Sequence, residues 1–131
     1  MSIEAARNAI KRASREGLTD AITGLPTAPI LAEKGADYLH VSAGVYGSKQ
    51  LTIPSMYVAH GCFVHLAEAV KKVVNIPVIG VGRVKSPELA DRILKEGRAD
   101  GVAMGRALIA DPMLPKKARA GNLKAIMPCL G

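Results

Sequence analysis

Three short apolar runs in this chain alternate with segments of helical periodicity, and this order restricts the fold more than any other feature. The runs cover residues 37–42, 78–81 and 99–104, and a glycine follows each run within two residues. Short, continuously apolar strands that alternate with helices pair in parallel, through right-handed crossovers. The sequence therefore predicts an α/β fold with about three parallel strands and flanking helices.

The helix between the second and third runs has the clearest boundaries. Ser86 is a typical N-cap, Pro87 suits the first helical position, Glu88 places an acid in the first turn, and Gly97 is a stop signal. The apolar positions of residues 61–74 predict a second long helix. The remaining expectations are helices over residues 2–16, 30–34, 106–109 and 115–120, and loops over residues 18–29 and 45–60.

A weak internal repeat favours a β/α barrel. The stretches LAEKGADYLHVSAG and ILKEGRADGVAMGR both contain a helix end, a glycine, Ala-Asp, an apolar strand and a glycine turn. A complete eight-fold barrel takes about 250 residues, whereas this chain has 131. We therefore expect a portion of a barrel.

The second and third runs both end in Gly-Arg, as Gly82-Arg83 and Gly105-Arg106. Glycine lets backbone N–H groups approach a phosphate, and a following arginine adds positive charge and a forked donor. Loops after the last strands of β/α barrels often bind phosphate in this way. The alternative is that the glycines only permit tight turns and the arginines are solvated.

Several short stretches of the sequence also resemble a known protein family. ELADRIL and MGRALIADP, with the two Gly-Arg words and GADYLHVSAGVY, resemble the C-terminal part of the Old Yellow Enzyme family, in its NADH:flavin oxidoreductase and 2,4-dienoyl-CoA reductase branch. The resemblance covers residues 35–131. It divides the chain into residues 1–34, a helix and loop that match poorly as a remnant of the preceding βα unit, and residues 35–131, the C-terminal βα units of an FMN-binding barrel.

The resemblance implies the C-terminal portion of a (β/α)8 TIM barrel that binds FMN. The expected function is transfer of hydride from NAD(P)H through the flavin to an activated alkene or enoyl substrate. Backbone groups of both Gly-Arg words would bind the FMN phosphate, and the Arg106 side chain could also reach the flavin or the phosphate. Ser42, Ala43 and Gly44 would lie at the rim on the substrate or flavin side. The implied cofactor-binding residues are Gly82, Arg83, Gly105, Arg106, Ser42 and Gly44.

Two departures from the family pattern limit this expectation. The family's flavin-ring contacts and proton-donating residues come largely from earlier strands, so no catalytic residue is assigned in this chain. Members of the branch also carry a cysteine cluster for an iron–sulfur centre after the barrel. Cys129 resembles its first cysteine, but one thiolate cannot hold a cluster that needs four. We therefore expect FMN contacts at the phosphate end only, and no iron–sulfur cluster.

An alternative to an active oxidoreductase is a catalytically inactive half-barrel. An open three-stranded parallel sheet leaves two edges and an apolar face uncovered, which favours self-association. The partners expected are therefore a flavin nucleotide and either a second copy of the chain or a missing front half-barrel.

Other kinds of site receive less support. His60, Cys62 and His65 are possible zinc ligands, but their spacing crosses a helix start and would turn them in different directions, so we expect no metal site and a buried Cys62. The net charge is +7, yet no aromatic residues interleave with the basic ones, which argues against nucleic acid. The lack of a long apolar run argues against a membrane span. Two cysteines make no disulfide framework, and the default localisation is cytoplasmic.

Overall fold

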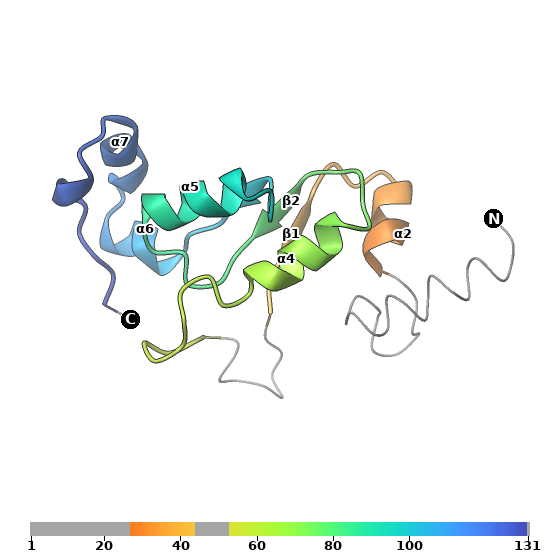
Figure 1. Ribbon diagram of the computed structural model, residues 1–131, viewed down its shortest axis with the longest axis horizontal. Coiled ribbons are helices and arrows are strands. Elements are labelled where there is room, and N and C mark those ends of the chain that lie inside the picture. The colour runs from red at the N-terminus through yellow and green to blue at the C-terminus, as the bar shows by residue number, and fades with distance from the viewer. Residues whose placement is uncertain (1–26, 44–52, 131) are drawn as a thin grey trace, which may run out of the picture.

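The computed structural model describes residues 27–43 and 53–130 (Figure 1). The helix predicted over residues 2–16, most of the loop predicted over residues 18–29, and Gly44 lie outside these ranges.

The sheet has three parallel strands, as the alternating pattern predicted. They are β1 (Leu39–Val41), β2 (Val78–Gly80) and β3 (Gly101–Val102), in the order β1-β2-β3. His40 is level with Ile79 in the first pairing, and Ile79 is level with Gly101 in the second. Each strand is shorter than predicted, because the outer residues of each apolar run leave the ladder. Some still bond to a neighbour, as when Ala103 N–H donates to Gly80 O (2.9 Å).

One helix precedes β1, and the others follow the strands in turn. They are α2 (Thr27–Glu33), α4 (Val64–Lys71), α5 (Pro87–Lys95), α6 (Arg106–Ala110) and α7 (Leu114–Arg119), with a 3-10 turn η2 (Leu123–Ala125). Helix α4 packs on β1 and β2, and α5 packs on β3. The molecule is elongated, with α2 near one end and α6 and α7 at the end that carries the C-terminus (Figure 1). None of the helices within the described ranges is long and apolar enough to cross a membrane.

Two helices have other boundaries than predicted. Helix α2 begins at Thr27, inside the stretch predicted as a loop up to residue 29. Helix α4 spans only Val64–Lys71, because residues 60–63 form turns and Gly61 has a φ of 74°. At the other end residues 72 and 73 form turns, and Val74 beyond them still packs against the core, so apolar periodicity overestimates the helix.

Helix α5 has the ends that its sequence predicted. Leu89 N–H donates to Ser86 Oγ (3.3 Å), with Pro87 as the first helical residue. At the other end Gly97 has a φ of 68°, and the next amide, Arg98 N–H, reaches back to Ile93 O (3.1 Å). This is the Schellman arrangement, in which glycine takes the left-handed position.

The core lies between the sheet and the helices α4 and α5. Its most buried large side chains are Val64, Val78 and Ile93, each at most 2% exposed. Ala67 and Ala99 fill the narrow space beside Gly80. Small residues at these positions let α4 approach the sheet closely.

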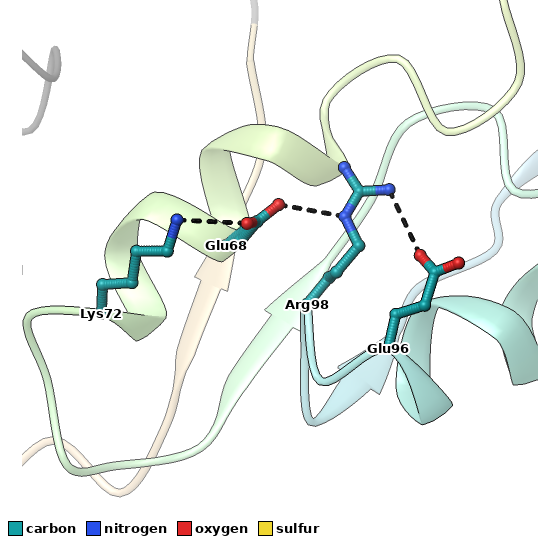
Figure 2. A network of polar contacts seen from close by, with 4 residues as sticks. All are labelled: Glu68, Lys72, Glu96 and Arg98. Atoms are coloured by element: carbon teal, nitrogen blue, oxygen red, sulfur yellow. Dashed lines mark hydrogen bonds and ion pairs between the residues drawn. The ribbon is translucent and has the colours of Figure 1, made fainter.

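Ion pairs connect the elements near the amino ends of the strands. Glu68 of α4 accepts hydrogen bonds from Lys72 Nζ (3.1 Å) and from Arg98 Nε (3.0 Å), and Arg98 also lies 3.8 Å from Glu96 (Figure 2). The hydrogen bond from Arg98, followed by that from Lys72, lowers the pKa of Glu68. This network ties α4 to the turn between α5 and β3.

A second carboxylate, Asp100, joins the starts of two strands. It accepts from Lys71 Nζ (2.6 Å) and from Val78 N–H (3.0 Å). These two bonds, that of Lys71 first, lower the pKa of Asp100. Both acidic groups therefore lie at the end of the sheet where the strands begin.

The C-terminal segment is attached to the rest of the protein by Asp111, which is 5 % exposed. Its carboxylate accepts from Lys117 Nζ (2.6 Å), from Met127 N–H (2.9 Å) and from Met113 N–H (3.0 Å). Lys117 in turn donates to Ala125 O (2.8 Å). The bond from Lys117, followed by that from the Met127 amide, lowers the pKa of Asp111.

Candidate functional site

An open cavity of about 530 Å³ lies at the carboxyl ends of the three strands. Five of the six cofactor-binding residues predicted from the sequence line it, namely Ser42, Gly82, Arg83, Gly105 and Arg106. The sixth, Gly44, lies outside the described residues. Parallel strands bring their carboxyl ends to one edge of a sheet, so residues far apart in the chain meet there.

Gly82 makes the first strand-end turn possible. Its φ is 135°, and a Cβ built on it would lie 2.7 Å from the Phe63 backbone nitrogen. A side chain at this position would therefore be strained and would also collide with the segment that leads into α4. Arg83 follows with a φ of 50°, the one positive value among described residues other than glycine. Positive φ at a bulky residue is rare and marks a backbone fixed by its surroundings.

The Arg83 side chain is buried, with 7 % of the residue exposed. Its Nη1 donates to the carbonyl oxygens of Met56 (3.1 Å) and Val58. Its Nε is buried without a hydrogen-bond partner among the described groups. The alternative of a solvated arginine therefore does not apply to Arg83.

Gly105 and Arg106 form the second strand-end turn. Gly105 has a φ of −92° and precedes the first residue of α6, and a Cβ built on it would meet no atom within 4 Å. Arg106 Nη2 donates to Pro54 O (3.1 Å). The two glycines thus differ: the space beside Gly82 is filled by protein, whereas the space beside Gly105 is open.

The charges around the cavity have one sign. Arg83, Lys85 and Arg106 line it, and no carboxylate is among its described lining residues. Burial, followed by the positive charges of Arg83 and Lys85, lowers the pKa of nearby His60. A group of positive charges without a matching acid favours an anionic ligand.

The possible zinc ligands of the sequence lie at the start of α4, with His60 and Cys62 before the helix and His65 in its first turn. Cys62 is only partly buried, which corrects the predicted full burial, and His65 is exposed. Burial raises the pKa of the Cys62 thiol, against opposing effects of backbone N–H groups and of Arg83 and Arg106. Across residues 27–43 and 53–130, no three His, Cys, Asp or Glu side chains are grouped to hold a metal ion.

The lining residues that sequence reasoning missed include Pro54, Phe63 and Lys85. Lys85 stands two positions after Arg83, so the run of basic residues after β2 was a usable signal. Pro54 and Phe63 belong to the long connection before α4, and nothing in their local sequence shows that they fold back onto the strand ends.

Comparison with known proteins gives a family for this arrangement. The sequence model of the NADH:flavin oxidoreductase / NADH oxidase family matches residues 12–124, and so extends upstream of residue 35. An NADH oxidase of Thermoanaerobacter brockii is 50% identical over 107 residues, which are 82% of this chain and 16% of the relative. A metal reductase of Desulforamulus reducens is 40% identical over 77% of this chain and 15% of its own length. A cinnamate reductase of Clostridium sporogenes is 36% identical over 82% of this chain and 16% of its own length.

Two solved structures support the same fold. A 2-naphthoyl-CoA reductase superposes with a TM-score of 0.68 at 28% identity, over 77% of this chain and 16% of its own. A histamine dehydrogenase from Rhizobium sp. 4-9 superposes with a TM-score of 0.66 at 27% identity, over 83% of this chain and 16% of its own. Both have the TIM-barrel fold.

The resemblance read from the Gly-Arg words is thus confirmed, and the three strands are a C-terminal portion of a TIM barrel. The chain spans about a sixth of the length of the curated relatives it matches. It belongs to the NADH:flavin oxidoreductase / NADH oxidase family.

Proposed function

We propose that this chain supplies the FMN phosphate-binding part of an oxidoreductase that passes hydride from NAD(P)H to an activated alkene or enoyl substrate. The observation that carries the proposal is the meeting of both Gly-Arg words in one cavity lined by three positive charges. The family suggests flavin chemistry, and relatives include a cinnamate reductase and a 2-naphthoyl-CoA reductase. Once bound, the flavin would supply the hydride transfer, while the protein binds and orients it.

The cavity fits a phosphate group in two respects. The open space beside Gly105 leaves room for an oxygen next to the backbone, and Arg83 keeps a buried donor, Nε, that no described group accepts. In this proposal the backbone at Gly82-Arg83 and at Gly105-Arg106 binds the phosphate, and Lys85 adds charge. Ser42 and Ala43 would lie toward the flavin or substrate side.

The remaining parts of the proposal concern the rest of the chain. Residues 1–34 would be a remnant of the preceding βα unit and residues 35–131 the FMN-binding units. Cys129 alone would hold no iron–sulfur cluster, because such a cluster takes four thiolates. Two cysteines make no disulfide framework, which fits a reducing compartment such as the cytoplasm.

Gly105→Ala tests the phosphate site without disturbing the fold. The added methyl meets no protein atom within 4 Å, so we expect an unchanged melting temperature. In the proposed site the same methyl takes the place of a phosphate oxygen, and we expect affinity for FMN to fall about ten-fold, or roughly 1.4 kcal/mol. Flavin fluorescence quenching on titration with protein measures the affinity.

Two controls make this result specific. Ile109→Ala changes an exposed side chain of α6 that does not line the cavity, and it should leave FMN affinity unchanged. Riboflavin lacks the phosphate, so Gly105→Ala should not alter its weaker binding. Equal affinity of the protein for FMN and riboflavin would show that the phosphate is not recognised and would rule out the proposal.

A second candidate is a catalytically inactive half-barrel that self-associates. Within the described sheet, β1 and β3 each pair with β2 only, so each leaves one edge without a strand. Exposed parallel edges favour pairing with another chain. Light scattering after size-exclusion chromatography should then show a dimer or larger species whose share grows with concentration. A single monomeric species at high concentration would argue against this candidate.

A further inference from the structure

The two arginines that line the cavity also hold one segment of the preceding connection, residues 53–58, which we call segment 53–58. Their guanidinium groups donate to three of its carbonyl oxygens, those of Pro54, Met56 and Val58. Within the described ranges, these bonds are the ones that join segment 53–58 to the rest of the protein by hydrogen bonding. A fourth bond, from Val58 N–H to Ser55 O (3.1 Å), closes a turn inside it.

Apolar burial adds little to the attachment of this segment. Ile53, Met56 and Tyr57 are exposed by 71%, 62% and 91%, and of its six residues only Pro54 is buried. Segments with few buried apolar contacts open at low free-energy cost. Among the described residues, the contacts that hold segment 53–58 are therefore chiefly those of Arg83 and Arg106.

Arg83 has a donor left for a second partner. Its Nη1 is used by segment 53–58, while its Nε is buried and unpartnered. A small shift of the guanidinium would let an anion in the cavity accept a hydrogen bond from Nε. Nη1 would keep its bonds to Met56 and Val58. Charge-assisted bonds to a guanidinium are the stronger kind, and a planar fork held at several points loses its freedom to turn away.

We propose that a phosphate group in the cavity fixes segment 53–58 in place, and that Arg83 is the positioning residue that couples the two. This inference rests on the proposed phosphate site. Coupling is reciprocal, so the fixed segment raises phosphate affinity by the same factor by which phosphate stabilises the segment. Ile53, which lines the cavity, and the exposed Met56 and Tyr57 are then held at its edge when the cavity is filled.

Chymotrypsin cleavage after Tyr57 reports directly on this segment, because proteases cut exposed chain that can leave its place. Inorganic phosphate is the probe, with chloride at matched ionic strength as its control. We expect phosphate to slow cleavage at Tyr57 about five-fold or more, the lower range of typical coupling. Cleavage at Tyr38, which is 58% exposed beside β1, is the internal reference and should not change. Hydrogen exchange of the Val58 amide should slow in parallel.

Arg83→Lys keeps the positive charge but removes the fork. We expect faster cleavage at Tyr57 without phosphate and no protection when phosphate is added. Arg98→Lys is the matched control, because Arg98 bonds Glu68 at the opposite end of the sheet (Figure 2), and it should respond to phosphate as the wild type does.

Calorimetry of phosphate binding to the wild type distinguishes a failure of the coupling from a failure of the phosphate site. Phosphate that binds without slowing cleavage or exchange would overturn the coupling and leave the proposed site standing. Phosphate that does not bind would overturn both. Protection that persists in Arg83→Lys would show that Arg83 is not the coupling residue. The wild-type titration decides the first two outcomes even if that variant does not fold.

Discussion

Gly82→Ala is expected to lower the free energy of unfolding by about 3 kcal/mol, since strain at a positive φ and overpacking each cost about 1–3 kcal/mol. The φ of Gly82 is 135°, which residues with a Cβ rarely adopt. The added methyl would also lie 2.7 Å from the Phe63 nitrogen and 3.0 Å from its Cβ. Relief requires moving backbone, because the nearest atom belongs to the main chain.

Urea unfolding followed by circular dichroism measures this effect. Gly105→Ala is the matched control, since it makes the same change in the other Gly-Arg word but places the methyl in open space. The midpoint should fall for Gly82→Ala and stay in place for Gly105→Ala. Equal midpoints for the two variants would contradict the packing of Phe63 against this turn.

Asp111→Ala is expected to have the second large effect, a lower melting temperature at pH 7 together with release of the C-terminal segment. The change removes the acceptor of three hydrogen bonds, from Met113, Lys117 and Met127. A buried donor without an acceptor is costly. Exchange of the Met127 amide should therefore accelerate far more than exchange of amides in α5.

The difference in melting temperature between wild type and Asp111→Ala should depend on pH. The folded protein lowers the pKa of Asp111, so its stabilising effect is fully present above the ordinary aspartate pKa of about 3.9. It is lost as the pH falls through the lower, folded value. The gap in melting temperature between wild type and Asp111→Ala should thus be widest near neutral pH and shrink below about pH 4.

Asp91→Ala is the control for this prediction. Asp91 is 60% exposed and pairs with Lys95 (2.7 Å) on α5, and such surface pairs contribute little. Its melting temperature should follow the wild type at every pH. A constant gap between wild type and Asp111→Ala down to pH 2 would show that the carboxylate charge is not what stabilises the segment.

The parts of the fold that depend on local chemistry could be predicted from the sequence. Helix α5 is the clearest case, because Ser86 at one end and Gly97 at the other act through bonds to residues within five positions. The start of α2 at Thr27 was missed, since Pro26 and Pro29 give a loop signal, whereas Pro29 lies in the first helical turn, where proline loses no hydrogen bond. Strand lengths were overestimated because an apolar run continues into buried turns that leave the ladder.

One part of the candidate site could likewise be predicted from the sequence, and another part could not. The Gly-Arg words could be placed in one cavity because parallel strands bring their ends together. The bonds of Arg83 and Arg106 to segment 53–58 span 25 to 52 residues of chain, and their acceptors are backbone oxygens. Every residue has such an oxygen, so no residue type in the sequence could mark Pro54, Met56 or Val58 as partners.

The order β1-β2-β3 places the two Gly-Arg turns after neighbouring strands, β2 and β3. Neighbouring strands in any sheet lie about 4.8 Å apart, so turns that follow two adjacent strands begin at nearly that separation, whatever the side chains are. Substitutions around the cavity can therefore retune charge and access, while the span between the two Gly-Arg turns stays set by backbone hydrogen bonding.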